Sequence, residues 1–106
     1  GSGDKAISIG EESQFDIFGV AINKARVGVA SKDNSIVKIE NMLLENSEIG
    51  FAAFQKKSEF GPGSIEVKGI SFDKINRKYI LESKSELIIN DKVYQPNTKN
   101  IKLILY

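Results

Sequence analysis

Apolar and polar residues alternate along most of this chain, with the period of two that is typical of β-strands. The alternating pattern returns about every 22 residues, once an insertion of about six residues near 56–61 is allowed for. Aligning the copies gives columns of apolar residues, which predict buried positions on successive strands. The columns are Ile7, Val29, Phe51 and Tyr79; Phe15, Val37, Ile65 and Leu87; Ile17, Ile39, Val67 and Ile89; and Ile22, Leu44, Phe72 and Tyr94.

Residues that favour sharp turns separate short apolar runs within each copy. The position between the second and third runs is occupied by Gly19, Asn41, Gly69 and Asp91. These residue types tolerate the left-handed backbone conformation that a corner between strands requires. The pattern therefore predicts an all-β fold: a right-handed parallel β-helix, or solenoid, with about four rungs spanning residues 4–94. A helix over 35–60 is disfavoured because isoleucine, valine and phenylalanine dominate the columns.

The ends of the chain and the insertion fall outside the repeat. Residues 55–63 predict a loop that interrupts one rung. Residues 95–106 predict a turn and a final strand over 101–106, which together cap the C-terminal end of the solenoid. No cap is evident at the N-terminal end, so we expect a domain cut from a longer protein that self-associates end to end there. Residues 1–3 have the composition of a linker scar left by expression.

The composition excludes several functions. The chain has 106 residues and a formal net charge of +1, from 15 basic and 14 acidic side chains. This balance provides no field for nucleic acid or an anionic membrane. The chain contains no cysteine and no histidine, so thiol chemistry and the commonest general base are excluded. No apolar run approaches the roughly 18 residues of a membrane span. We expect no cofactor and no metal.

Three stretches of the repeat carry a resemblance to a known class of proteins: residues 7–11, 27–33 and 50–61. They are similar to the terminal rungs of right-handed parallel β-helix domains in bacterial surface proteins, within the pectate-lyase-like repeat class. Some of those proteins also carry a kinase-like domain of the spore-coat CotH type. The resemblance implies an extracellular or cell-surface location and an association with carbohydrate. It transfers no kinase or lyase residue, since nothing in this chain matches those catalytic motifs.

The insertion and the corner beside it supply the candidate ligand-binding residues. Insertions in solenoids tend to lie on the binding face, and charged and aromatic side chains together can contact a sugar or an acidic polymer. The alternative is a solvated loop in which the ring of Phe60 folds back onto the sheet. The candidates are Phe54, Lys56, Lys57, Glu59, Phe60, Lys32 and Asp33.

Other clusters invite a functional interpretation but have simpler explanations. Small residues at Ala6, Gly28 and Gly50 predict an outward face that either accepts a polysaccharide or is covered by a loop, the tail or another domain. The acidic corner at Glu11, Glu12 and Asp33 is not a calcium cage, because Lys32 stands in the same stack. A solvated corner is expected there.

Charged residues on the second run form another outward cluster. Asp16, Lys38 and Glu66 fall at equivalent positions of successive copies, where opposite charges on neighbouring strands attract. Lys38 separates the carboxylates, so the column is a charge ladder and not an acid–base pair.

The sequence favours a non-catalytic structural or interaction module over an enzyme. It predicts the terminal part of a larger bacterial surface protein that binds a glycan or a partner domain. The alternative is a fragment of a polysaccharide lyase or hydrolase whose catalytic residues lie outside this chain. The length of the parent protein separates these hypotheses, because many further rungs with acidic clusters would favour the enzyme.

Overall fold

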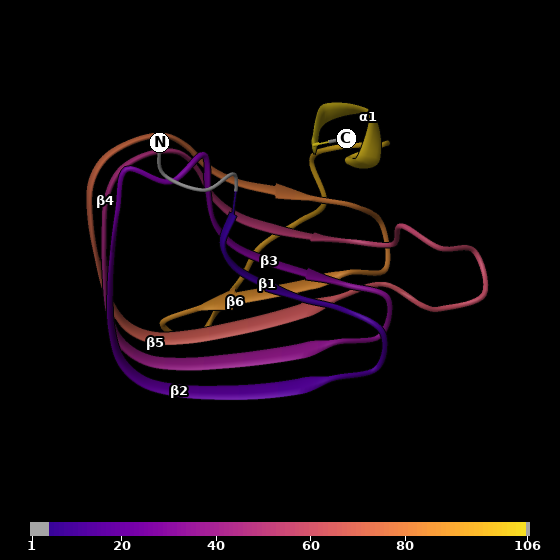
Figure 1. Ribbon diagram of the computed structural model, residues 1–106, viewed down its shortest axis with the longest axis horizontal. Coiled ribbons are helices and arrows are strands. Elements are labelled where there is room, and N and C mark those ends of the chain that lie inside the picture. Colours follow the sequence, from indigo (N-terminus) through magenta and orange to yellow (C-terminus); the bar gives the residue numbers. More distant parts are fainter. Residues whose placement is uncertain (1–4, 106) are drawn as a thin grey trace.

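The computed structural model describes residues 5–105, which form a single seven-stranded sheet and one short helix (Figure 1). The predicted scar at 1–3 lies outside the described residues. The strands are β1 (Lys5–Ile9), β2 (Gln14–Asn23), β3 (Val27–Lys32), β4 (Ile36–Phe54), β5 (Ser64–Leu81), β6 (Glu86–Ile89) and β7 (Lys92–Val93), and the helix is α1 (Lys102–Leu105). The strand order is β1-β3-β4-β5-β6-β7, and β2 pairs with β4 off this path. Every pair is parallel except β6 and β7.

The predicted right-handed β-helix of about four rungs is wrong, because the chain forms one mixed sheet with long strands. β4 has 19 residues and β5 has 18. The prediction divided each copy into short strands at its corners. The ladder between β4 and β5 instead pairs residues on both sides of Asn41 and Asn46, whose φ angles are 60° and 51°. An asparagine in the left-handed region turns the chain without ending the strand pairing. The short strands that were expected on either side of each corner are therefore joined into one long bent strand.

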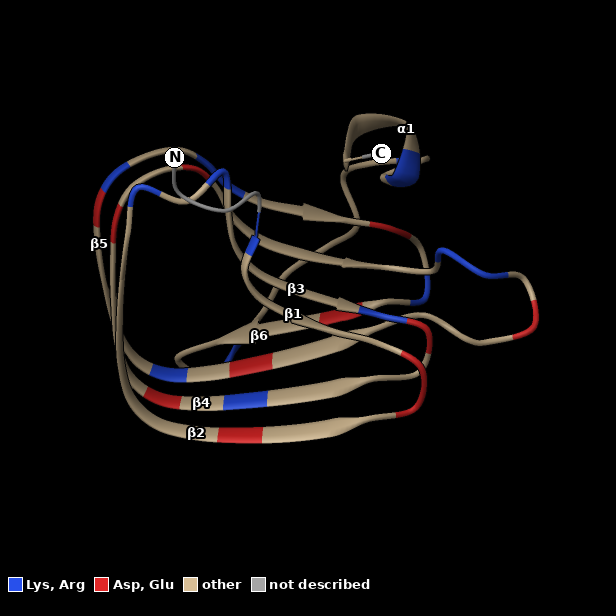
Figure 2. Cartoon of the chain, in the orientation of Figure 1, with Lys and Arg blue, Asp and Glu red and all other residues tan. Residues whose placement is uncertain are grey.

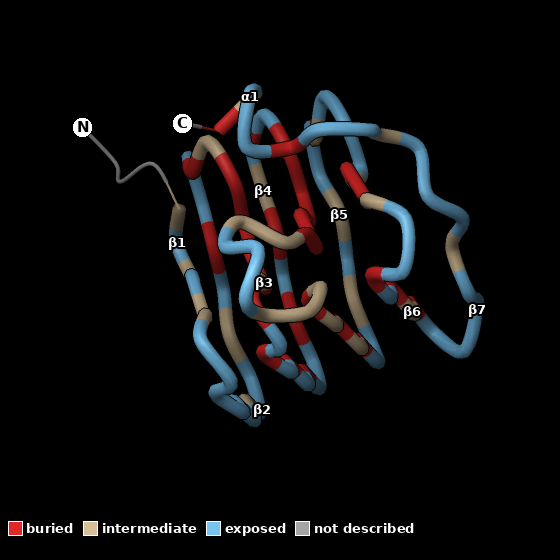
Figure 3. Tube along the Cα trace, turned by 90° about the vertical axis from the view of Figure 1, so that its right-hand side faces the viewer, coloured by how far each residue is buried: buried red, intermediate tan, exposed pale blue. Residues whose placement is uncertain are grey.

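The strand registers place the apolar columns side by side, as the alignment of the copies predicts. Phe15 pairs with Val37, Val37 with Ile65, and Ile65 with Leu87. Within the column that contains Ile17, the residues Ile39 and Val67 are 1% and 0% exposed, whereas Ile17 is half-buried. Burial therefore falls off toward β2, as the colours of Figure 3 show.

The bent sheet encloses one core and carries a second on its outer side. The enclosed core contains Phe51, whose ring meets that of Phe72 edge to face at a centroid distance of 6.2 Å. The outer core lies on β3, β4 and β5 and is covered by residues of the C-terminal segment. It consists of Val27, Ala30, Ile49, Ala52, Phe54, Ile80, Ile101 and Leu105.

The C-terminal segment differs from its prediction in form and in place. Residues 101–106 were expected to form a strand that caps the end of a solenoid, but Lys102–Leu105 is helical and lies on the outer face of the sheet. Glu82 Oε2 accepts a hydrogen bond of 2.7 Å from the Ile101 amide, and Arg26 Nη2 donates one of 2.8 Å to the Ile104 carbonyl. The tail thus covers the face with Ala30 and Ala52. No helix of the described residues is long and apolar enough to cross a membrane.

The glycines of the small-residue column face inward, contrary to the expected outward platform. A Cβ on Gly28 would lie 2.7 Å from the Gly50 carbonyl oxygen and 2.8 Å from Leu44 Cδ1, a residue of the enclosed core. A Cβ on Gly50 would lie 2.4 Å from the Lys78 carbonyl oxygen. These glycines therefore allow neighbouring strands to approach closely beside the core, and they offer no surface to a sugar.

The sheet has an open end and a closed end, which lie on opposite sides of the molecule in Figure 3. At the open end, β1 pairs with β3 and β2 pairs with β4, and neither has a second partner among the described strands. The closed end consists of β6, β7 and residues 94–98. There the Tyr94 ring packs against Tyr79 at 5.0 Å, and the Asn97 amide donates a 2.9 Å hydrogen bond to the Leu81 carbonyl.

Candidate functional site

The loop at 55–63 joins β4 to β5 and projects from the edge of the molecule in Figure 1. Asp33 holds its beginning, because Asp33 Oδ1 accepts hydrogen bonds of 2.9 Å from the amides of both Lys56 and Lys57. The Gln55 side-chain amide donates to the carbonyls of Lys57 and Phe60 within the loop. Asp33 is 0% exposed, so the expected solvated corner is wrong for this residue. The buried Asp33 carboxylate therefore fixes the beginning of the loop through these two backbone amides.

Lys57 forms an ion pair with Glu11 across the corner. The hydrogen bond to Glu11 and the negative charge of Glu11 raise the pKa of Lys57 above its usual range, and the charges of Glu59 and Asp33 act in the same direction. The side chains of the pair are 45% and 53% exposed. Water and salt therefore screen the attraction, and the pair stabilises the fold only slightly.

The candidate ligand residues of the sequence do not share one surface. Phe54 is 0% exposed and belongs to the outer core beneath the C-terminal segment. Asp33 is buried, whereas Lys57 and Glu59 are exposed and Lys32, Lys56 and Phe60 are half-buried. The loop therefore presents Lys57 and Glu59 to solvent without the aromatic platform that Phe54 was expected to supply.

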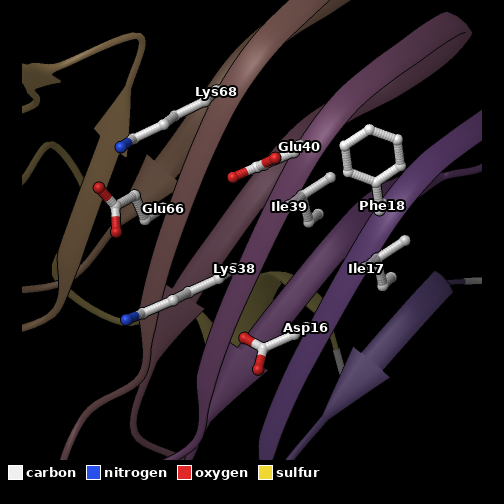
Figure 4. A pocket seen from close by; sticks show the side chains of 8 residues that line it. All are labelled: Asp16, Ile17, Phe18, Lys38, Ile39, Glu40, Glu66 and Lys68. Carbon is white, nitrogen blue, oxygen red and sulfur yellow. The ribbon is translucent and has the colours of Figure 1, made fainter.

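A shallow groove on the outer face of β2, β4 and β5 is the other candidate (Figure 4). Asp16 pairs with Lys38 and Lys38 with Glu66, so the predicted ladder stands on adjacent strands. Figure 2 shows the alternation of acidic and basic bands across these strands. The groove is lined by Asp16, Ile17, Phe18, Lys38, Ile39, Glu40, Glu66 and Lys68.

A second row runs beside this ladder, two residues further along each strand. It pairs Phe18 with Glu40 and Glu40 with Lys68. On β4 a base and an acid alternate along the strand, and on β5 their order is reversed. Within the groove, Lys38 and Glu40 on β4 thus each have an oppositely charged neighbour on β5, an arrangement that stabilises adjacent strands.

The alternation stops at β2, which forms the edge of the sheet. Asp16 has a basic neighbour on the β4 side, and no strand of the described part of the chain lies on its other side. Phe18 occupies the position beside Glu40 and is 74% exposed, and Phe15 on the inward face is 38% exposed. Sequence reasoning missed Phe18, because a lone aromatic at an outward position has no special meaning until its strand is known to be an edge.

The described residues include no group of three or more histidine, cysteine or carboxylate side chains arranged to hold a metal ion. Comparisons with protein families, with curated proteins and with solved structures find no match to this chain. The relationship to bacterial surface proteins therefore stays a prediction.

Proposed function

We propose that this chain is a non-catalytic interaction module that binds a partner polypeptide as an added strand at its open end. The observation that carries this proposal is the unpaired side of β2. This strand has 10 residues and presents a phenylalanine that is 74% exposed. Within residues 5–105 it pairs with β4 alone. A free strand edge offers a row of amides and carbonyls that another extended chain can pair with.

The composition of β2 supports a docking edge. Proteins usually protect free edges with lysine, proline or very short strands. β2 contains neither lysine nor proline, and Asp16 is its one charged residue. β7, at the closed end, has only two residues and carries Lys92. The contrast favours β2 as a surface that is kept available for pairing.

A polypeptide suits the open end better than a glycan suits the loop. The loop lacks an exposed aromatic platform, since Phe54 is buried. The open end combines free backbone groups with the exposed apolar rings of Phe15 and Phe18, which an added strand would cover. End-to-end self-association is the case in which the partner is a second copy. A glycan ligand and a cell-surface location stay predictions.

Titration with a strand peptide tests the proposal. The probe is a synthetic peptide with the sequence of residues 36–45, which already pair with β2 in the protein. We expect amide chemical shifts to change along β2 and not along β6 or β7. The matched control is the same peptide N-methylated at alternate residues, which cannot pair along one side. Equal binding of the control, or changes confined to the loop at 55–63, would contradict the proposal.

A further inference from the structure

Opposite charges alternate across β2, β4 and β5 in the groove, from Asp16 through Lys38 to Glu66. Lys38 lies between Asp16 and Glu66 in the ladder, with an acid on each side. Asp16 itself has a basic neighbour on the β4 side, and none of the strands in residues 5–105 lies beside it on the other side. A strand added there would place a side chain directly opposite Asp16. Opposite charges on adjacent strands attract and like charges repel, so a basic side chain would fit beside Asp16 and an acidic one would be repelled.

The neighbouring positions specify apolar residues. Phe15 and Ile17 flank Asp16 and point to the enclosed core, where their columns continue as Val37 and Ile39. Phe15 is 38% exposed and Ile17 is half-buried, so each lacks a neighbour on the open side. Aliphatic side chains on an added strand would extend these columns and remove the rings and methyl groups from water.

Phe18 accommodates a second basic residue. Its ring stands in the outward row and is 74% exposed. A cation over an exposed aromatic ring is weakly attracted, and the closed end shows the same contact, with Lys92 Nζ 5.3 Å from the Tyr94 ring centroid. The outward positions of the partner strand can therefore both be basic.

A second copy of this chain fits the open end poorly. Suppose that the β2 strands of two copies pair antiparallel around a two-fold axis through residues 14–18. Asp16 of one copy then lies opposite Asp16 of the other, or opposite Gln14 or Phe18 when the register shifts. None of these registers supplies a base, because residues 14–18 contain no lysine or arginine. Two further strands, β1 and β7, also have one neighbour among the described strands. β1 has five residues and β7 has two, so neither can cover the ten residues of β2.

We infer that the partner of the open end is a strand of another protein with alternating aliphatic and basic residues, and with a lysine or arginine opposite Asp16. This inference rests on the proposed function and adds to it the charge pattern of the partner.

Charge exchange between the peptide and β2 tests it. The probes are the peptide with the sequence of residues 36–45 and the same peptide carrying Lys38→Glu. We expect the first to bind the unaltered protein about fivefold more tightly than the second. The Asp16→Lys variant should instead bind the Lys38→Glu peptide more tightly. The Asp16→Asn variant should bind both peptides equally, and it replaces Asp16→Lys in the test if Asp16→Lys weakens the fold.

The outcomes separate the two levels of the proposal. If both peptides bind the protein equally, or the Glu peptide binds more tightly, the inferred charge pattern is wrong and strand docking survives. If neither peptide binds to a monomeric protein, the docking function is itself wrong. Sedimentation across a concentration series completes the test, because a dimer that excludes the peptides would identify a second copy as the occupant and overturn the inference.

Discussion

The open and closed ends of the sheet differ in the residues that cover the last strand and the enclosed core. Without a cover, each end would expose part of the enclosed core and the backbone groups of its last strand. At the closed end, Asn90 and Asp91 turn the chain at φ angles of 49° and 67°, and β7 returns antiparallel to β6. Tyr94 then packs on Tyr79 over the core. At the open end, the described residues provide no such cover for β1 and β2, and Phe15 is 38% exposed.

The difference shows that a free edge is not an unavoidable feature of this fold. A few residues with left-handed turns and one aromatic ring suffice to close the core at β6. On the other side of the sheet, the ten residues of β2 have one described partner strand, β4. An edge of that length without lysine or proline is prone to pairing with other strands, which is why we connect the open end with binding and the closed end with stability.

The largest effect on stability should come from a charge placed in the apolar column that contains Ile17 and Val67. Val67 is 0% exposed in the enclosed core, so Val67→Asp would bury an unpaired carboxylate and destabilise the fold by about 4 kcal/mol or more. Ile17 stands in the same column at the open end and is half-buried, so Ile17→Asp should cost about 1 kcal/mol. Urea denaturation of both variants measures the difference. Equal losses would show that the open end is covered in solution.

The next effect concerns the C-terminal segment on the outer face. Ile101 is 0% exposed and packs in the outer core, so Ile101→Ala should cost about 3 kcal/mol. Hydrogen exchange should then accelerate at the Ile101 amide, which binds Glu82. Leu103→Ala is the matched control, since Leu103 is 75% exposed on the same helix. A loss as large for Leu103→Ala would contradict the observed orientation of α1.

Sequence reasoning predicted which residues pair and failed to predict the strands that contain them. The column Phe15, Val37, Ile65 and Leu87 was visible because one side chain of each copy faces the core, and that face repeats. The corners were misjudged because a turn signal such as Asn41 does not reveal whether pairing continues through it. The helix at 102–105 was missed because Leu and Ile in a short run are compatible with either structure.

The candidate site was predictable only in part, for similar reasons. The ladder of Asp16, Lys38 and Glu66 followed from the period of the sequence alone. The role of Asp33 did not, because its burial depends on the loop residues Lys56 and Lys57 folding back over it. Phe54 was expected to be exposed, and its cover comes from Ile101 and Leu105, far away in the sequence.

A smaller effect should appear at high pH. The pKa of Lys57 is raised by its hydrogen bond to Glu11 and by the charge of Glu11. The stability from this pair is therefore fully present below the unfolded pKa of about 10.4 and is lost as pH rises through the folded pKa. Urea midpoints between about pH 9 and about pH 12 should fall less steeply in Lys57→Met than in the unaltered protein. A profile for Lys57→Met that matches the profile of the unaltered protein would contradict the pairing.

The smallest effect on stability should come from Phe18, although its effect on docking should be clear. Phe18 is 74% exposed at the open end, so Phe18→Ala should change the free energy of unfolding by no more than about 0.5 kcal/mol. Tyr94 is the matched aromatic of the closed end, half-buried against Tyr79, and Tyr94→Ala should cost about 2 kcal/mol. Binding of the peptide with the sequence of residues 36–45 should show the opposite order, because Phe18 lies on the strand that the peptide pairs with. Loss of binding in Tyr94→Ala with binding intact in Phe18→Ala would move the docking surface to the closed end and remove the distinction between an end that stabilises and an end that binds.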